Sequence, residues 1–173
     1  PGLPAAAADT GETVNIAVLS ESSALYLDQV AGSSALQPHN WVGQHIPLHA
    51  TSNGKVLLSG LDDKRVTEVL GTLSRYTALT ITTRAKLREE LAVVREQGYA
   101  VAVDELEEGL TAVAAPIRNA HGDVVASMSV SGPTFRLPEG RVARCSTSSS
   151  RPPPRSRTAS AGVTAESQLG RSA

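Results

Sequence analysis

The sequence of 173 residues is poor in the residue types that build disulfide-bonded, aromatic-lined and membrane-spanning structures. Cys145 is the one cysteine, which excludes a disulfide framework within the chain and a zinc site made of cysteines. Aromatic residues make up 3% of the chain, too few to favour an aromatic cage around a cationic ligand. No apolar run approaches the roughly 20 residues of a membrane span. These absences predict a cytoplasmic protein without a membrane partner.

The chain also lacks the motifs of nucleotide binding, metal binding and nucleophilic catalysis. Gly54-Lys55 matches part of a phosphate-binding P-loop, but His49 and Val56 stand where that loop needs a glycine and a hydroxyl residue. His45 and His49 could share one face only in a helix, and Pro47 between them disfavours that helix, so a histidine-based metal site is the less favoured interpretation. No Gly-x-Ser-x-Gly motif is present. We therefore predict no catalytic residue, no metal and no cofactor, and the net charge of −1 argues against a large nucleic-acid-binding face.

Composition divides the chain into three parts. Residues 1–8 lack the basic and apolar pattern of a signal peptide, and we expect them to form a flexible end. Residues 9–140 have the apolar periodicity of one folded domain. Residues 141–173 are rich in serine, arginine and proline without such periodicity, which predicts a disordered or aberrant tail.

Hydrophobic periodicity between residues 9 and 140 predicts an α+β fold. The first two strands have a short polar turn between them, which is typical of an antiparallel hairpin. Pro116 is expected at a sheet edge, a bulge or a strand end, since it has no N–H to donate. The predicted strands are 13–20, 24–30, 99–103, 110–117 and 124–131, with a short β-rich link at 77–82, and the predicted helices are 53–58, 62–70 and 83–97.

The start of the first of these helices is a candidate binding site. Thr51, Ser52 and Asn53 are all good N-cap residues, and an apolar run begins directly after them. The first turn of a helix has free N–H groups and the positive end of the helix dipole, so it binds small anions when it faces a cavity. An ordinary capped helix start explains the same residues.

The last predicted strand places a row of hydroxyl groups on one face. Ser127, Ser129 and Ser131 alternate with apolar residues, so their side chains point the same way. Such a row is usually the solvent-facing side of a sheet. If it faces a helix N-terminus, it forms the polar floor of a pocket.

Three stretches together resemble one known family. Residues 43–61, GQHIPLHATSNGKVLLSGL, resemble the Pro-Leu-His and Gly-Lys signature of the effector-binding domain of IclR-type transcriptional regulators. Residues 95–133 and the strand pair at 13–31 agree with that family in order and spacing. The resemblance implies a GAF/PAS-like domain with an antiparallel sheet flanked by helices. It also implies self-association as a dimer or tetramer, and contact with operator DNA only through a winged-helix domain that this chain lacks.

The resemblance further implies a site for a small organic effector, which is a carboxylate or an aromatic acid in well-known members. Where the family often has an acid, this chain has Ala102, and the nearest acid is Asp104, which suggests a different or less polar ligand. The effector-binding residues implied are Ser52, Asn53 and Gly54 at the helix start, Ala112, Ser129 and Ser131 on the last strands, the acid Asp104, and an apolar wall of Ile46, Leu48, Leu110 and Trp41.

Three functional hypotheses follow. The first is a small-molecule-sensing regulatory domain that is not an enzyme. The second is an enzyme that modifies a small molecule on a similar fold. The third is a dimerisation module whose pocket is vestigial.

Overall fold

The structure is a computed structural model that describes residues 3–34 and 39–138. Its elements confirm the predicted α+β class. The helices are α1 (Leu3–Thr10), α2 (Ser52–Ser59), α3 (Asp63–Val69) and α4 (Arg84–Gln97), followed by the short 3-10 helix η1 (Thr134–Arg136). The strands are β1 (Thr13–Ser20), β2 (Ser23–Val30), β3 (His45–Pro47), β4 (Ala100–Val103), β5 (Leu110–Arg118) and β6 (Val124–Pro133).

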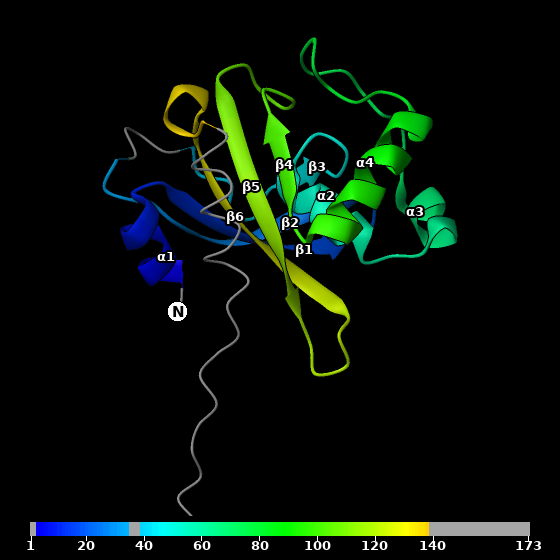
Figure 1. The fold of residues 1–173 in the computed structure, drawn as a ribbon, viewed down its shortest axis with the longest axis horizontal. Helices are drawn as coiled ribbons and strands as arrows, with labels where there is room; N and C mark the ends of the chain where they lie inside the picture. Colours follow the sequence, from blue (N-terminus) through cyan, green and yellow to red (C-terminus); the bar gives the residue numbers. More distant parts are fainter. Residues whose placement is uncertain (1–2, 35–38, 139–173) are drawn as a thin grey trace, which may run out of the picture.

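The strands form one antiparallel sheet in the order β3-β2-β1-β6-β5-β4 (Figure 1). The predicted hairpin is β1–β2, and the pairing of β1 with β6 joins it to the β5–β6 hairpin. In that pairing Asn15 lies opposite Ser129. Pro116 lies beyond the part of β5 that pairs with β4, at an edge where no N–H is required.

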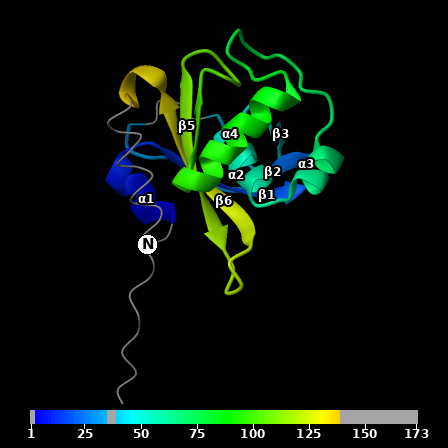
Figure 2. The ribbon, with the colours of Figure 1, turned by 45° about the vertical axis from the view of Figure 1, so that its right-hand side comes forward.

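Helices α2, α3 and α4 lie on one side of the sheet, and α1 lies at the other end of the molecule against β1 and β2 (Figure 1). Helix α2 is the central helix, because it packs on β1, β4, β5 and β6 and is covered by α4 (Figure 2). Its residues from 52 to 58 are all buried. This enclosure brings the first turn of α2 close to the inner face of the sheet.

The helix ends follow the expected capping rules. Of the three candidate caps, Thr51 is the N-cap of α2, and its hydroxyl accepts a hydrogen bond of 3.1 Å from the Gly54 N–H. Asp62 and Thr83 cap α3 and α4 in the same way, because their side-chain oxygens accept from the backbone N–H groups of Arg65 and Lys86. Gly98 ends α4 in the left-handed conformation with φ of 83°, which glycine adopts without strain.

The N-terminal segment differs from the sequence-based expectation. Residues 1–8 were expected to be a flexible end, but α1 begins at Leu3, and its Ala7 is buried against Val14 and Val130. A run of alanines has high helix propensity and also fits closely against a sheet. The tail at 141–173 lies outside the described residues.

The link at 77–82 was expected to be rich in β structure, but it contains no strand. Its threonine hydroxyls bond to backbone carbonyls in place of a sheet partner. Thr77 Oγ1 donates to the Asp104 carbonyl at 2.6 Å, and Thr80 Oγ1 donates to the Glu105 carbonyl at 2.6 Å. The same hydroxyl-rich composition that favours strands therefore fixes the β4–β5 loop.

Replacing Leu91 by alanine is expected to destabilise the domain by about 2–5 kcal/mol, because it leaves a cavity in the core. Leu91 is 1% exposed and packs in the cluster that joins α4 to α2 and the sheet. Val93 on the same helix is 49% exposed, so Val93→Ala should change stability by about 0.5 kcal/mol or less. Urea denaturation of both variants measures this, and equal losses would contradict the assigned core.

Candidate functional site

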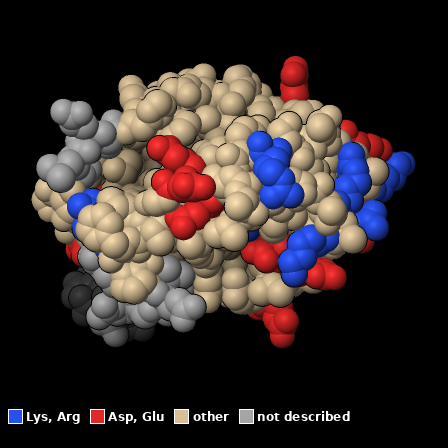
Figure 3. Space-filling view, turned by 90° about the horizontal axis from the view of Figure 1, so that it is seen from above, with Lys and Arg blue, Asp and Glu red and all other residues tan. Residues whose placement is uncertain are grey.

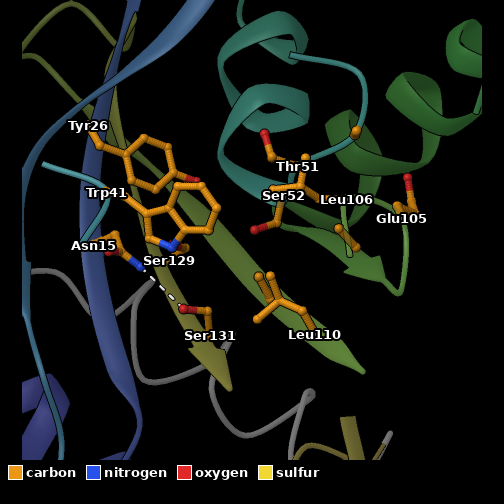
Figure 4. Close-up of a pocket in the computed structure, with 13 residues that line it drawn as sticks. Asn15, Tyr26, Trp41, Thr51, Ser52, Glu105, Leu106, Leu110, Ser129 and Ser131 are labelled. Atoms are coloured by element: carbon orange, nitrogen blue, oxygen red, sulfur yellow. Dashed lines mark hydrogen bonds between the residues drawn. The ribbon is translucent and has the colours of Figure 1, made fainter. Parts of the chain in front are cut away.

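A cavity lies between the first turn of α2 and the inner face of the sheet (Figure 4). The empty space between its lining residues is about 400 Å³, which includes space open to solvent, and the centre of a water molecule can move through only about 30 Å³ of it. One water needs about 10–15 Å³ by the second measure, so the space suits a small ligand. The lining residues are Asn15, Tyr26, Trp41, Ala50, Thr51, Ser52, Ala102, Glu105, Leu106, Leu110, Ala112, Ser129 and Ser131.

The cavity brings together residues that the sequence analysis selected from distant parts of the chain. Ser52 comes from the start of α2, and Ser129 and Ser131 come from β6 (Figure 4). Ala112 on β5, Leu110 at its start and Trp41 in the loop before β3 also line the space.

Asn53 is fully buried but does not line the cavity. Its Nδ2 donates to Ser129 Oγ at 2.9 Å, and its Oδ1 accepts from Ser127 Oγ at 2.8 Å. The Asn53 side chain therefore bridges α2 to β6. Its partners lie more than 70 positions away in sequence, so the helix-start pattern could not identify this role.

The other predicted residues outside the cavity have structural contacts of their own. A Cβ at Gly54 would overlap the backbone of Leu48, so the helix and the preceding chain approach closely there. Ile46 and Leu48 are buried in the main core cluster. Asp104 Oδ1 accepts from Thr134 Oγ1 at 2.6 Å, which ties the β4–β5 loop to η1.

Several lining residues were not selected from sequence. Asn15 lies within an alternating run that predicts a strand, and nothing in the local pattern indicates that β1 pairs with β6. Glu105 belongs to a cluster of acidic residues, and such a cluster usually forms a solvent-facing turn. Thr51 was selected only as a candidate helix cap, and Ala102 was noted only as the position where the family often has an acid. Ala50, Tyr26 and Leu106 carry no separate signal in the sequence.

A buried ion cluster around Lys55 includes Glu105, which is one of the residues that line the cavity. The Lys55 side chain is 0% exposed, and its Nζ donates to Glu105 Oε1 at 2.7 Å, Glu90 Oε1 at 3.1 Å and the Val101 carbonyl at 3.0 Å. Burial raises the pKa of Glu105, against the attraction of Lys55, and the nearby Glu90 charge raises it further. Glu105 Oε2 is buried with no partner in the described part of the chain.

Two aromatic residues form the opposite wall. Burial raises the pKa of Tyr26 to about 12, against a smaller lowering by its hydrogen bond with Asn53, so the phenol stays neutral. Its ring centroid lies 6.3 Å from that of Trp41, and the His39 ring lies 4.2 Å from Trp41 on the outside. This wall is therefore mostly aromatic, and its polar groups, the phenol and the indole N–H, carry no charge.

The first turn of α2 supplies hydrogen-bond donors. Gly54 N–H bonds to the Thr51 hydroxyl, and Lys55 N–H bonds to the Thr51 carbonyl. Among the described residues, the backbone N–H groups of Ser52 and Asn53 have no partner. Since Ser52 lines the cavity, this turn can bind a carboxylate there.

An outer groove continues from the cavity to the surface and shares Trp41, Leu110 and Ser131 with it. The volume open to the centre of a water molecule is about 360 Å³ there. Glu107 and Glu108 line the groove, and Figure 3 shows acidic side chains beside a hollow on this face. A ligand can reach the cavity by this route.

Glu105→Gln is expected to change how stability depends on pH. The folded pKa of Glu105 is raised above its ordinary value of 4.5, so the folded chain holds this proton more tightly than the unfolded chain. The contribution of Glu105 is largest below about pH 4.5 and is lost as the pH rises through the folded pKa. Urea denaturation between pH 4 and pH 8 should show that loss in the wild type and a flatter profile in the variant.

Glu89→Gln is the matched control, because the Glu89 side chain is 70% exposed on the outer side of α4. It should keep the pH profile of the wild type. Parallel profiles for the wild type and Glu105→Gln would contradict the assigned environment of Glu105.

Within residues 3–34 and 39–138, no group of three or more histidine, cysteine, aspartate or glutamate side chains is arranged to hold a metal ion. No helix in those ranges is long and apolar enough to cross a membrane.

Comparison with known proteins identifies relatives of the whole domain. The HTH-type transcriptional regulator KdgR of Dickeya chrysanthemi is 37% identical over 132 residues, which are 75% of this chain and 43% of that regulator. The crystal structure of the Thermotoga maritima IclR matches with a TM-score of 0.79 and 31% identity, over 84% of this chain and 60% of that one. A double mutant of the PobR inducer-binding domain of Acinetobacter, in complex with 3-hydroxybenzoic acid, matches with a TM-score of 0.75 and 30% identity, over 84% of this chain and 89% of that one.

These likenesses confirm the predicted GAF/PAS-like fold. The chain spans about half the length of the curated relatives it matches. The sequence model described as "Bacterial transcriptional regulator IclR C-terminal" matches residues 1–148. The chain therefore belongs to the family of C-terminal domains of IclR-type bacterial transcriptional regulators.

Proposed function

We propose that this domain senses a small organic acid for a DNA-binding transcriptional regulator, and that the acid binds in the cavity beside α2. One observation carries the proposal: donors of the first turn of α2 and hydroxyls of β6 line the same cavity. Ser52 contributes from the helix, and Ser129 and Ser131 contribute from the strand. An apolar pocket with a few convergent polar groups is the usual form of a small-molecule site.

The size of the cavity favours a short aliphatic carboxylate over an aromatic acid. The space open to water centres corresponds to two or three water molecules, which suits a ligand of two to four carbons. The carboxylate accepts hydrogen bonds from the Ser52 region, where the helix dipole also favours negative charge. The PobR domain was solved with an aromatic acid, and binding one here requires Trp41 or Leu110 to move.

The path from ligand to output runs through α2. A ligand at Ser52 contacts the helix whose Lys55 bonds to Glu90 of α4 and whose Asn53 bonds to β6. A shift of α2 therefore changes its contacts with both α4 and the sheet. In the whole regulator we place operator binding in a helix-turn-helix domain outside this chain, self-association in a dimer or tetramer, and the site of action in the cytoplasm.

The two other hypotheses have less support. The relatives are transcriptional regulators and not enzymes. A vestigial pocket agrees with the small volume, but it does not explain why polar groups of three elements line it. Measuring the mass of the ligand recovered after incubation separates a sensor from an enzyme, because a sensor returns the ligand unchanged and an enzyme does not. A domain with a vestigial pocket neither alters the ligand nor gains a higher melting temperature from it.

Short carboxylic acids are expected to raise the melting temperature of the wild-type domain, because a ligand of the folded state stabilises it by mass action. Ala112→Leu should weaken the binding of an active acid by tenfold or more, since the larger side chain fills the cavity that Ala112 lines. Differential scanning fluorimetry with a panel of two- to four-carbon acids measures the first effect, and calorimetry measures the second.

Ala126→Leu is the matched control, because Ala126 is on β6 but does not line the cavity. It should bind the acid as the wild type does. Equal affinity of the Ala112→Leu variant, with its fold confirmed by circular dichroism, would place the acid elsewhere.

A further inference from the structure

We infer that the cavity selects an acid that also carries a hydroxyl group, and that the side chain of Asn15 recognises this hydroxyl. The inference rests on the proposed function, because it names the ligand class of the same cavity.

Asn15 is a buried polar residue in the middle of the sheet. It lies on β1 between Gln29 of β2 and Ser129 of β6, and it is 1% exposed. Its Nδ2 donates to Ser131 Oγ at 3.2 Å, as the dashed line in Figure 4 marks. Its Oδ1 is buried and has no partner among the described residues. A buried acceptor without a donor costs free energy, and a ligand that supplies the donor recovers it.

The other polar groups of the wall complement a carboxylate and do not satisfy Asn15. Ser129 Oγ accepts from Asn53, and Ser131 Oγ accepts from Asn15, so each serine hydroxyl keeps its proton for the ligand. With the Ser52 N–H, these groups donate hydrogen bonds. A carboxylate supplies the acceptors that such donors need.

Asn15 supplies an acceptor that a plain acid leaves unmatched, because its Oδ1 is buried and has no partner among the described residues. No lysine, arginine or histidine is among the lining residues. A ligand that only accepts hydrogen bonds therefore leaves Asn15 without a partner, whereas a hydroxyl group both donates to Oδ1 and fits the small space.

A keto acid is the informative competitor. The carbonyl group of a keto acid accepts hydrogen bonds and cannot donate one, although its size and charge match the hydroxy acid. If the Asn15 amide were turned over, with Oδ1 toward Ser131, the group facing the ligand would be a donor, and the keto acid would bind better. The order of affinities therefore tests the assigned role of Asn15.

The experiment compares lactate, pyruvate and propionate, which share a three-carbon acid skeleton and differ at one position. Calorimetry on the wild-type domain should give a dissociation constant for lactate about tenfold or more below those of pyruvate and propionate. In Asn15→Leu, which has a similar shape and no polar atoms, the three constants should fall within about threefold of one another. Circular dichroism and the melting temperature without ligand establish that the variant is folded.

Gln97→Leu is the control for exchanging an amide for leucine, because Gln97 is exposed at the end of α4. It should keep the preference for lactate. The comparison of the three acids on the wild type needs no variant, so it tests the inference even if Asn15→Leu does not fold.

Equal binding of the three acids by the wild type, or tighter binding of pyruvate, overturns the inference and leaves the proposed function standing. A preference for lactate that persists in folded Asn15→Leu also overturns the role of Asn15. If none of the three acids, nor any other short acid, raises the melting temperature, the proposed function fails and the inference fails with it.

Discussion

The buried ammonium group of Lys55 holds together the parts of the domain that surround the cavity. It lies on α2, and its three acceptors come from α4, from β4 and from the loop that follows β4. Removing one partner of such a cluster leaves an uncompensated charge in a region of low dielectric, which is strongly destabilising. The two carboxylates share one cation, so Glu105 is held at the cavity, where burial raises its pKa against the attraction of Lys55. The Lys55 cluster therefore influences both the position of α2 and the electrostatics of the cavity.

A second connection fixes the same helix to the sheet. The serine row on β6 had two interpretations from sequence, a solvent-facing side or the floor of a pocket. Ser127 and Ser129 are 0% and 2% exposed, and both bond to Asn53 of α2. Part of the hydroxyl row is thus a structural bridge, and its far end at Ser131 reaches the cavity. One row of hydroxyls serves packing at one end and the candidate site at the other.

The sequence predicted most elements because their signals are local. Alternation on β1 and β2, the caps of the helices and the glycine after α4 each depend on a few adjacent residues. The candidate site was predicted in part, since the start of α2 and the serine row each have a local pattern. The role of Asn53 and the position of Asn15 depend on partners across the sheet, which no local pattern encodes. Glu105 was not selected because a cluster of acidic residues usually faces water, and its burial depends on a lysine 50 positions earlier.

The acidic residues of the outer groove have a consequence for kinetics. Glu107 and Glu108 carry negative charge along the route to the cavity, and the nearby Glu12 is neutralised by Arg136 at 3.0 Å. An anionic effector approaching this mouth is repelled over a distance of about 10 Å in about 0.1 M salt, and over a longer distance in more dilute buffer. Its association rate should then rise with ionic strength, opposite to the usual behaviour of an anion steered by a basic funnel.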